Sequence, residues 1–155
     1  MYKRKININI LNKNLFSLQL KKAIFYSFLE ARKYENTIID SQFLLYGILK
    51  TNHSIIYTVI QQISKTRSLS FNLRRELLIK LKLNFQTKNK LNFSSTDQTY
   101  PNFSRTIKRL LVFLINSPQQ NSKISVITTL QVFKYLLHNK SVSKLIKDCL
   151  VTGST

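Results

Sequence analysis

Glycine and proline are scarce in this chain, with two residues of each among 155. Both types punctuate hairpins and tight turns, so their scarcity favours helices over a sheet of short hairpins. The single cysteine, Cys149, excludes an internal disulfide and is typical of a reducing compartment. No uncharged apolar run reaches the roughly 18 residues that cross a bilayer, and the basic N-terminus lacks the apolar segment of a secretory signal.

Acidic residues are also few, because 6 Asp and Glu stand against 25 Lys and Arg, for a net charge of +19. A field of this sign attracts polyanions such as RNA, DNA or an acidic protein. A second interpretation stays open, because Lys, Asn, Ile, Phe and Tyr dominate the chain and all have AT-rich codons. An AT-rich genome, such as an organelle's, would place Lys and Asn on a surface without any binding role.

Residues that carry enzyme chemistry are sparse and scattered. His53, His138 and Cys149 are too far apart for a zinc-ligand spacing. The acidic residues form no close pair suited to acid–base work, and no Gly-x-Ser-x-Gly nucleophile motif occurs. Gly47 and Gly153 cannot form a phosphate-cradling loop, which needs closely spaced glycines before Lys-Ser or Lys-Thr. We therefore expect a protein that is not an enzyme and holds no cofactor or metal.

Hydrophobic residues make up 43% of the chain, which is enough to bury a core. Apolar residues recur at helical intervals and predict helices from Ser104 and from Thr128, and over residues 17–33, 41–50, 55–63, 72–83 and 142–150. Pro118 should end the helix from Ser104 near residues 116–117, because proline removes a backbone donor. The aromatic residues within these helices are predicted core residues: Tyr26, Phe28, Phe43, Tyr46, Phe113, Phe133 and Tyr135.

Two polar segments flank or divide these helices. Residues 1–15 form a basic N-terminal arm, and residues 85–102, rich in Asn, Ser, Thr and Lys, form a linker without apolar periodicity. The aromatic residues best suited to contact nucleic acid or peptide lie in this linker beside lysines: Phe85, Phe93 and Tyr100 with Lys88 and Lys90.

Residues 103–111, FSRTIKRLL, contain the pattern around which the chain is organised. Ser104 is a good N-cap, Phe103 before it can pack on the first turn, and one helical face carries Ile107, Leu110, Leu111 and Leu114. The pattern occurs twice, because Phe16-Ser17 opens another apolar helix 87 residues earlier. At the same shift Ser41 falls on Thr128, and each is predicted to cap a second helix. The chain is therefore predicted to be an internal duplication.

These residues resemble the double-repeat N-terminal domain of Clp chaperones. Residues 41–49, SQFLLYGIL, are similar to the family's T-E-H-L-L-L-G-L-L motif, and residues 103–111 are similar to its F-T-x-x-x-K-R-x-L opening of the second repeat. The resemblance covers residues 16–150. It implies an all-α fold, in which two pseudo-symmetric four-helix repeats form one bundle. The first repeat would span residues 16–84, and the second, truncated and degenerate, residues 103–150.

In the family this domain precedes ATPase rings that unfold proteins for the Clp peptidase, and it docks adaptors and substrates. Because this chain has no ATPase motif, the resemblance implies a free-standing, non-catalytic module whose partners are Clp chaperone or peptidase subunits, adaptors or substrates. The AT-rich composition, without a transit peptide, suggests a plastid-encoded protein in the chloroplast stroma. The alternative hypothesis is a basic nucleic-acid- or ribosome-associated protein, which the +19 charge favours.

The resemblance also implies positions for partner binding. In some family members the Thr of each F-T and the Glu of each T-E-H line paired sites for phosphorylated arginine. The matching positions are Ser17 with Gln42, and Ser104 with Thr129. Neutral Gln42 and Thr129 cannot pair with a guanidinium as a carboxylate does, so recognition of phosphorylated arginine is not expected. The four residues are predicted to lie near grooves that face a partner segment, and for Ser17 and Ser104 a purely structural role as helix caps is the alternative.

Overall fold

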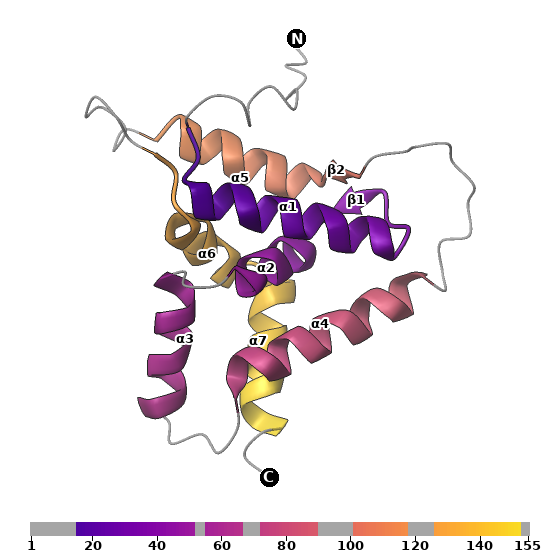
Figure 1. Cartoon of the computed structure of the whole chain (residues 1–155), viewed down its shortest axis with the longest axis vertical. Helices are drawn as coiled ribbons and strands as arrows, with labels where there is room; N and C mark the ends of the chain where they lie inside the picture. Colours follow the sequence, from indigo (N-terminus) through magenta and orange to yellow (C-terminus); the bar gives the residue numbers. More distant parts are fainter. Residues whose placement is uncertain (1–14, 52–54, 67–71, 90–100, 118–125, 153–155) are drawn as a thin grey trace.

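The computed structural model describes residues 15–51, 55–66, 72–89, 101–117 and 126–152. These segments contain seven helices and two strands of two residues each, so the predicted all-α fold is confirmed (Figure 1). The elements in chain order are α1 (Leu18–Lys33), β1 (Ile38–Ile39), α2 (Ser41–Lys50), α3 (Ile55–Thr66), α4 (Leu73–Asn89), β2 (Asn102–Phe103), α5 (Arg105–Ile115), α6 (Thr129–Leu137) and α7 (Lys140–Thr152).

Helix α2 lies at the centre of the molecule (Figure 1). Every residue from Ser41 to Leu49 is buried, because α1, α3, α4, α6 and α7 all pack against it. Gly47 makes the closest of these approaches possible, since a methyl group there would overlap the Ala23 carbonyl oxygen and the Ser27 hydroxyl of α1. The Ser27 hydroxyl donates a hydrogen bond to Ala23 O at 2.8 Å, so this buried hydroxyl has a hydrogen-bond partner.

The two halves of the chain are joined crosswise by short parallel pairings. The segment that leads into α1 pairs with the segment that leads into α6, through the bridge between Phe16 and Ile127. The segment that leads into α2 pairs with the segment that leads into α5, through strands β1 and β2. The amides of Ser17 and Ser104 donate to Ile127 O and Ile39 O, each at 2.9 Å. Each half therefore supplies backbone partners to the other.

Helix α4 closes the core with an aromatic cluster. Phe85 is 1% exposed and stacks on Phe43, with ring centroids 3.9 Å apart, while Tyr34 and Tyr46 meet its edges. The prediction that the linker begins at Phe85, and that this residue is suited to contact nucleic acid or peptide, is therefore wrong. The apolar stripe continues at four-residue intervals through Leu73, Leu77, Leu81 and Phe85. The Asn- and Lys-rich composition of the residues around Phe85 favoured a linker and outweighed this single further apolar position. The linker residues 90–100, with Lys90, Phe93 and Tyr100, lie outside the described residues.

Three of the four predicted caps are confirmed: Ser17 caps α1, Ser104 caps α5 and Thr128 caps α6. The cap predicted at Ser41 is wrong, because α2 begins there and its N-cap is Asp40. The Asp40 Oδ1 atom accepts bonds from the amides of Gln42 and Phe43, at 2.9 and 3.1 Å. A carboxylate reaches two free first-turn donors at once, so the residue before the serine takes the role.

Helix α4 extends six residues beyond its predicted end at residue 83, whereas the other predicted helix ends hold to within three residues. Helix α5 ends at Ile115, as expected ahead of Pro118, which itself lies outside the described residues. Its buried face is Ile107, Leu111 and Leu114, whereas Leu110, predicted for the same face, is half-buried. Residues 1–14 of the predicted arm, and also His53 and Gly153, lie outside the described residues.

The contact at Gly47 predicts a large effect of a small change. Gly47→Ala should lower the free energy of unfolding by about 2 kcal/mol, because the methyl group forces α1 and α2 apart although alanine favours a helix more than glycine does. Urea unfolding followed by circular dichroism measures this, with exposed Lys22→Ala on α1 as a control that stays within about 0.5 kcal/mol of the parent. Stability equal to the parent's would show that the helices do not approach so closely.

Candidate interaction site

The four predicted site residues have structural roles. Ser17 Oγ accepts from the Leu20 amide at 3.1 Å, and Ser104 Oγ accepts from the Ile107 amide at 3.3 Å. Both hydroxyls thus stabilise the first turns of α1 and α5. Thr129 is buried in the first turn of α6.

Gln42 is buried and connects three helices. Its Nε2 atom donates to Ser141 Oγ of α7 at 2.6 Å, and Lys88 Nζ of α4 donates to its Oε1 atom at 3.4 Å. The same lysine pairs with Asp40 Oδ2 at 2.8 Å. Gln42 therefore fixes α4 and α7 to the start of α2, and its side chain is already engaged within the protein.

The structure separates Ser17 from Gln42, one of the two predicted pairs. Helix α2 turns back along α1, with Gly47 against Ala23, so Ser17 and Gln42 lie toward opposite ends of this helix pair. The crosswise pairing instead places Ser17 beside the start of α6 and Ser104 beside the start of α2. The pairing of Ser17 with Gln42 and of Ser104 with Thr129 assumed that each half forms its own site.

A groove beside the Ser104 cap was missed by sequence reasoning. It has a volume of about 390 Å³ between α5, the end of α6 and the start of α2. Its lining is Ser41, Thr106, Ile107, Arg109, Leu110, Phe113, Tyr135, Leu136, His138 and Asn139. Apolar side chains thus line much of it, and Arg109 and His138 add basic groups.

Two aromatic residues of this groove were predicted to lie in the core. Phe113 is 54% exposed, and its ring meets the exposed Tyr135 ring edge-on, with centroids 5.2 Å apart. The signal was present in the sequence, because Phe113 falls off the apolar face formed by Ile107, Leu111 and Leu114. Tyr26 on α1 is likewise exposed, whereas Phe43, Tyr46 and Phe133 are buried as predicted and Phe28 is partly buried.

One buried polar contact lies between α1 and α2. Glu30 is buried, and its Oε1 atom has no hydrogen-bond partner among the described residues. Burial raises the pKa of Tyr46 well above its usual range, and the charge of Glu30 and its hydrogen bond to the Tyr46 hydroxyl raise it further. Tyr46 is therefore a neutral donor to Glu30 at any physiological pH.

Within the ranges that the structure describes, no three His, Cys, Asp or Glu side chains are grouped so that they could hold a metal ion. In the same ranges, no helix is both long and apolar enough to span a membrane. The sequence matches no protein-family model and no curated protein. The resemblance to the Clp N-terminal domain stays a prediction.

The polar cluster at the start of α2 predicts different effects of two changes at one residue. Asp40→Ala removes the cap of α2 and the Lys88 ion pair, and should lower the free energy of unfolding by about 1–2 kcal/mol. Asp40→Asn keeps an oxygen acceptor for the cap, and should cost no more than about 1 kcal/mol through the lost surface ion pair. Urea unfolding of both variants measures the difference, and equal losses would contradict the capping role.

Cys149 should be inert in the folded protein. It is buried in α7, and this burial raises the pKa of its thiol, so the reactive thiolate is rare at neutral pH. We expect a thiol reagent to modify it slowly at pH 7.5 in buffer and rapidly in concentrated urea. A rapid reaction in buffer, at the rate found for the unfolded chain, would mean that the packing of α7 on its neighbouring helices does not bury the sulfur.

Proposed function

We propose that this protein is a non-catalytic interaction module, similar to the N-terminal domain of Clp chaperones, that works in the stroma of a plastid. It docks adaptors, substrates, or chaperone or peptidase subunits of the ATP-dependent Clp protease system. Its mechanism is docking of a partner segment without chemistry. The two halves are the repeats of one duplicated helical unit, of which the second is shorter.

The crosswise pairing of the two halves is the observation that carries this proposal. Phe16 and Phe103 each stand one residue before a capping serine. Phe16 pairs with Ile127, which precedes the N-cap of α6, and Phe103 pairs with Ile39, which precedes the N-cap of α2. Contacts between helices are reciprocal in the same way. Helix α3 of the first half packs on α6 of the second half, and α7 of the second half packs on α2 of the first half. A duplicated unit related by an approximate two-fold axis produces this reciprocity.

The groove between α5 and α6 is the docking surface that fits this function. Phe113, Tyr135 and Leu110 offer apolar area to a partner, and exposed aromatic residues of this kind often dominate the affinity of an interface. Arg109 lies in the same groove and can pair with a carboxylate. The groove therefore suits a partner segment with an apolar side chain next to an acidic one.

Capture of partners from plastid extract tests the proposal. The tagged protein is incubated with nuclease-treated native extract at roughly physiological salt, where exposed charges more than about 8 Å apart are largely screened. Retained Clp chaperone or peptidase subunits are identified and quantified. We expect the Phe113→Asp variant to lose them at least about tenfold, since a charge in the apolar groove removes a central contact.

Phe25→Asp is the matched control, because Phe25 on α1 is 57% exposed, against 54% for Phe113, and lies outside the groove. It should retain the Clp subunits at the parent's level. Capture of ribosomal proteins alone, or of no Clp subunit, would contradict the proposed function. Equal losses in the two variants would contradict the assignment of the groove.

A further inference from the structure

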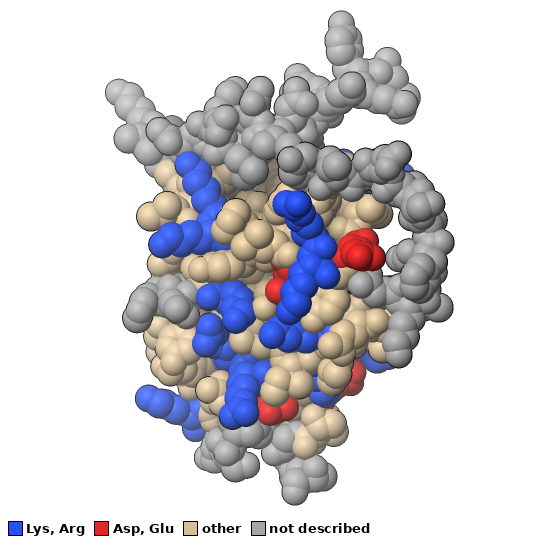
Figure 2. All heavy atoms as spheres, turned by 45° about the vertical axis from the view of Figure 1, so that its right-hand side comes forward, with Lys and Arg blue, Asp and Glu red and all other residues tan. Residues whose placement is uncertain are grey.

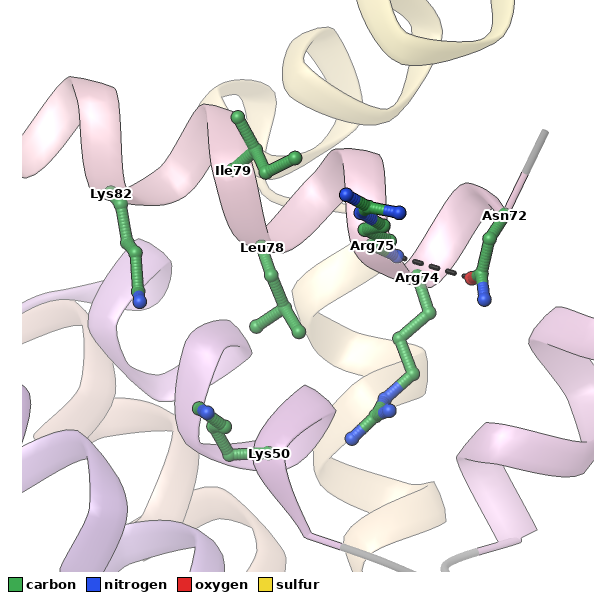
Figure 3. A pocket seen from close by; sticks show the side chains of 7 residues that line it. All are labelled: Lys50, Asn72, Arg74, Arg75, Leu78, Ile79 and Lys82. Carbon is green, nitrogen blue, oxygen red and sulfur yellow. Dashed lines mark hydrogen bonds between the residues drawn. The ribbon is translucent and has the colours of Figure 1, made fainter.

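Positive charge gathers where α4 passes the end of α2. Figure 2 shows Lys and Arg atoms in a broken band down one face, with few Asp or Glu atoms among them. A hollow of about 340 Å³ lies between these helices, lined by Lys50, Asn72, Arg74, Arg75, Leu78, Ile79 and Lys82 (Figure 3). We call this hollow the basic cleft. Four of its seven lining residues are cationic and none is acidic.

The fold itself brings these cations together. Arg75 and Lys82 are seven residues apart on α4, near the spacing of two helical turns, and Lys50 is the last residue of α2. In Figure 3, Arg74, Leu78 and Lys82 project from α4 toward the end of α2, where Lys50 lies. The cleft is therefore built from two helices that the core holds in fixed positions.

One cation of the cleft is held by neutral groups. Arg74 Nε donates to Leu49 O of α2 at 2.7 Å, and its guanidinium lies over the Tyr57 ring of α3, 5.3 Å from the centroid. Neither contact neutralises the positive charge of Arg74, and both restrict its side chain. Binding of an anion would therefore cost less side-chain entropy at Arg74.

Among the described residues, the other cations of the cleft form no ion pair. No described carboxylate lies within ion-pair distance of Lys50, Arg75 or Lys82. Glu76 is next to Arg75 in sequence but is not among the residues that line the cleft. Cations that line one hollow without anions repel one another, and a bound anion removes this repulsion. The basic cleft thus has the charge and the rigidity of an anion site.

We propose that the basic cleft binds the phosphate backbone of a single-stranded nucleic acid. A strand presents many closely spaced phosphates, which suits several cations in an open hollow better than a single phosphoryl group does. The +19 charge of the chain attracts the strand from a distance, and the cleft then fixes its backbone. Ile79 lines the cleft and is exposed, so it offers apolar surface to a sugar or base.

A charge-matched comparison tests this site. Fluorescence anisotropy measures the affinity for a labelled RNA of about 20 nucleotides, long enough for one binding site, over a range of salt concentrations. The cleft variant combines Lys50→Gln, Arg75→Gln and Lys82→Gln, and keeps Arg74 because of its structural contacts. The control variant combines Lys140→Gln, Lys144→Gln and Lys147→Gln around a hollow on α7 that also contains Asp148. Each variant loses three positive charges.

We expect the cleft variant to bind RNA at least about tenfold more weakly, and the slope of log affinity against log salt to fall by about 2, since each lost phosphate contact removes about 0.7. The control variant should stay within about threefold of the parent, because its three lysines do not line the cleft and salt screens exposed charges that make no direct contact. Circular dichroism and thermal melting confirm that both variants fold.

Three results would overturn the proposal. Equal weakening in both variants would mean that RNA binds the overall field and not the cleft. Unchanged binding in the cleft variant would exclude the site. Displacement of RNA by polyglutamate at an equal concentration of charge would assign the cleft to acidic proteins instead. Phe113→Asp should bind RNA as the parent does, so this proposal and the docking function can fail separately.

Discussion

The close contact between α1 and α2 is the constraint on which the other packing depends. Gly47 has no side chain, so α2 lies directly against the Ala23 carbonyl and Ser27 of α1. This approach leaves the other sides of α2 available to α4, α6 and α7, and its residues from Ser41 to Leu49 become buried. A helix buried on all sides fixes the positions of its neighbours, because a shift of any one of them opens a cavity in the core.

The surfaces with proposed roles are consequences of this arrangement. The crosswise pairing brings the cap of α5 to the start of α2, and the groove with Phe113 and Tyr135 lies beside this junction. On another part of the surface, the end of α2 meets α4 and brings Lys50 to the basic cleft. One surface is rich in apolar side chains and the other in positive charge, so they suit partners of different chemistry. Both are positioned by the same buried helix.

The sequence predicted the helices well because apolar periodicity and capping residues are local signals. The all-α fold and the caps at Ser17, Ser104 and Thr128 follow from them. The prediction for Phe85 was wrong because the residues around it have the polar composition of a linker, and its packing partners Tyr34, Phe43 and Tyr46 come from distant parts of the chain. The site was harder still. Its groove and cleft combine residues from different helices, and the crosswise pairing, which no local pattern encodes, decides which of them meet.

Native-state hydrogen exchange tests most directly the claim that the two halves form one unit around α2. The amides of Ser17 and Ser104 donate bonds across the two halves, to Ile127 and Ile39. We expect both amides to exchange only through the global unfolding that also releases the amides of α2, with the same free energy. Exchange of Ser17 and Ser104 at a much lower free energy than α2 would contradict the account, because the halves would then open independently.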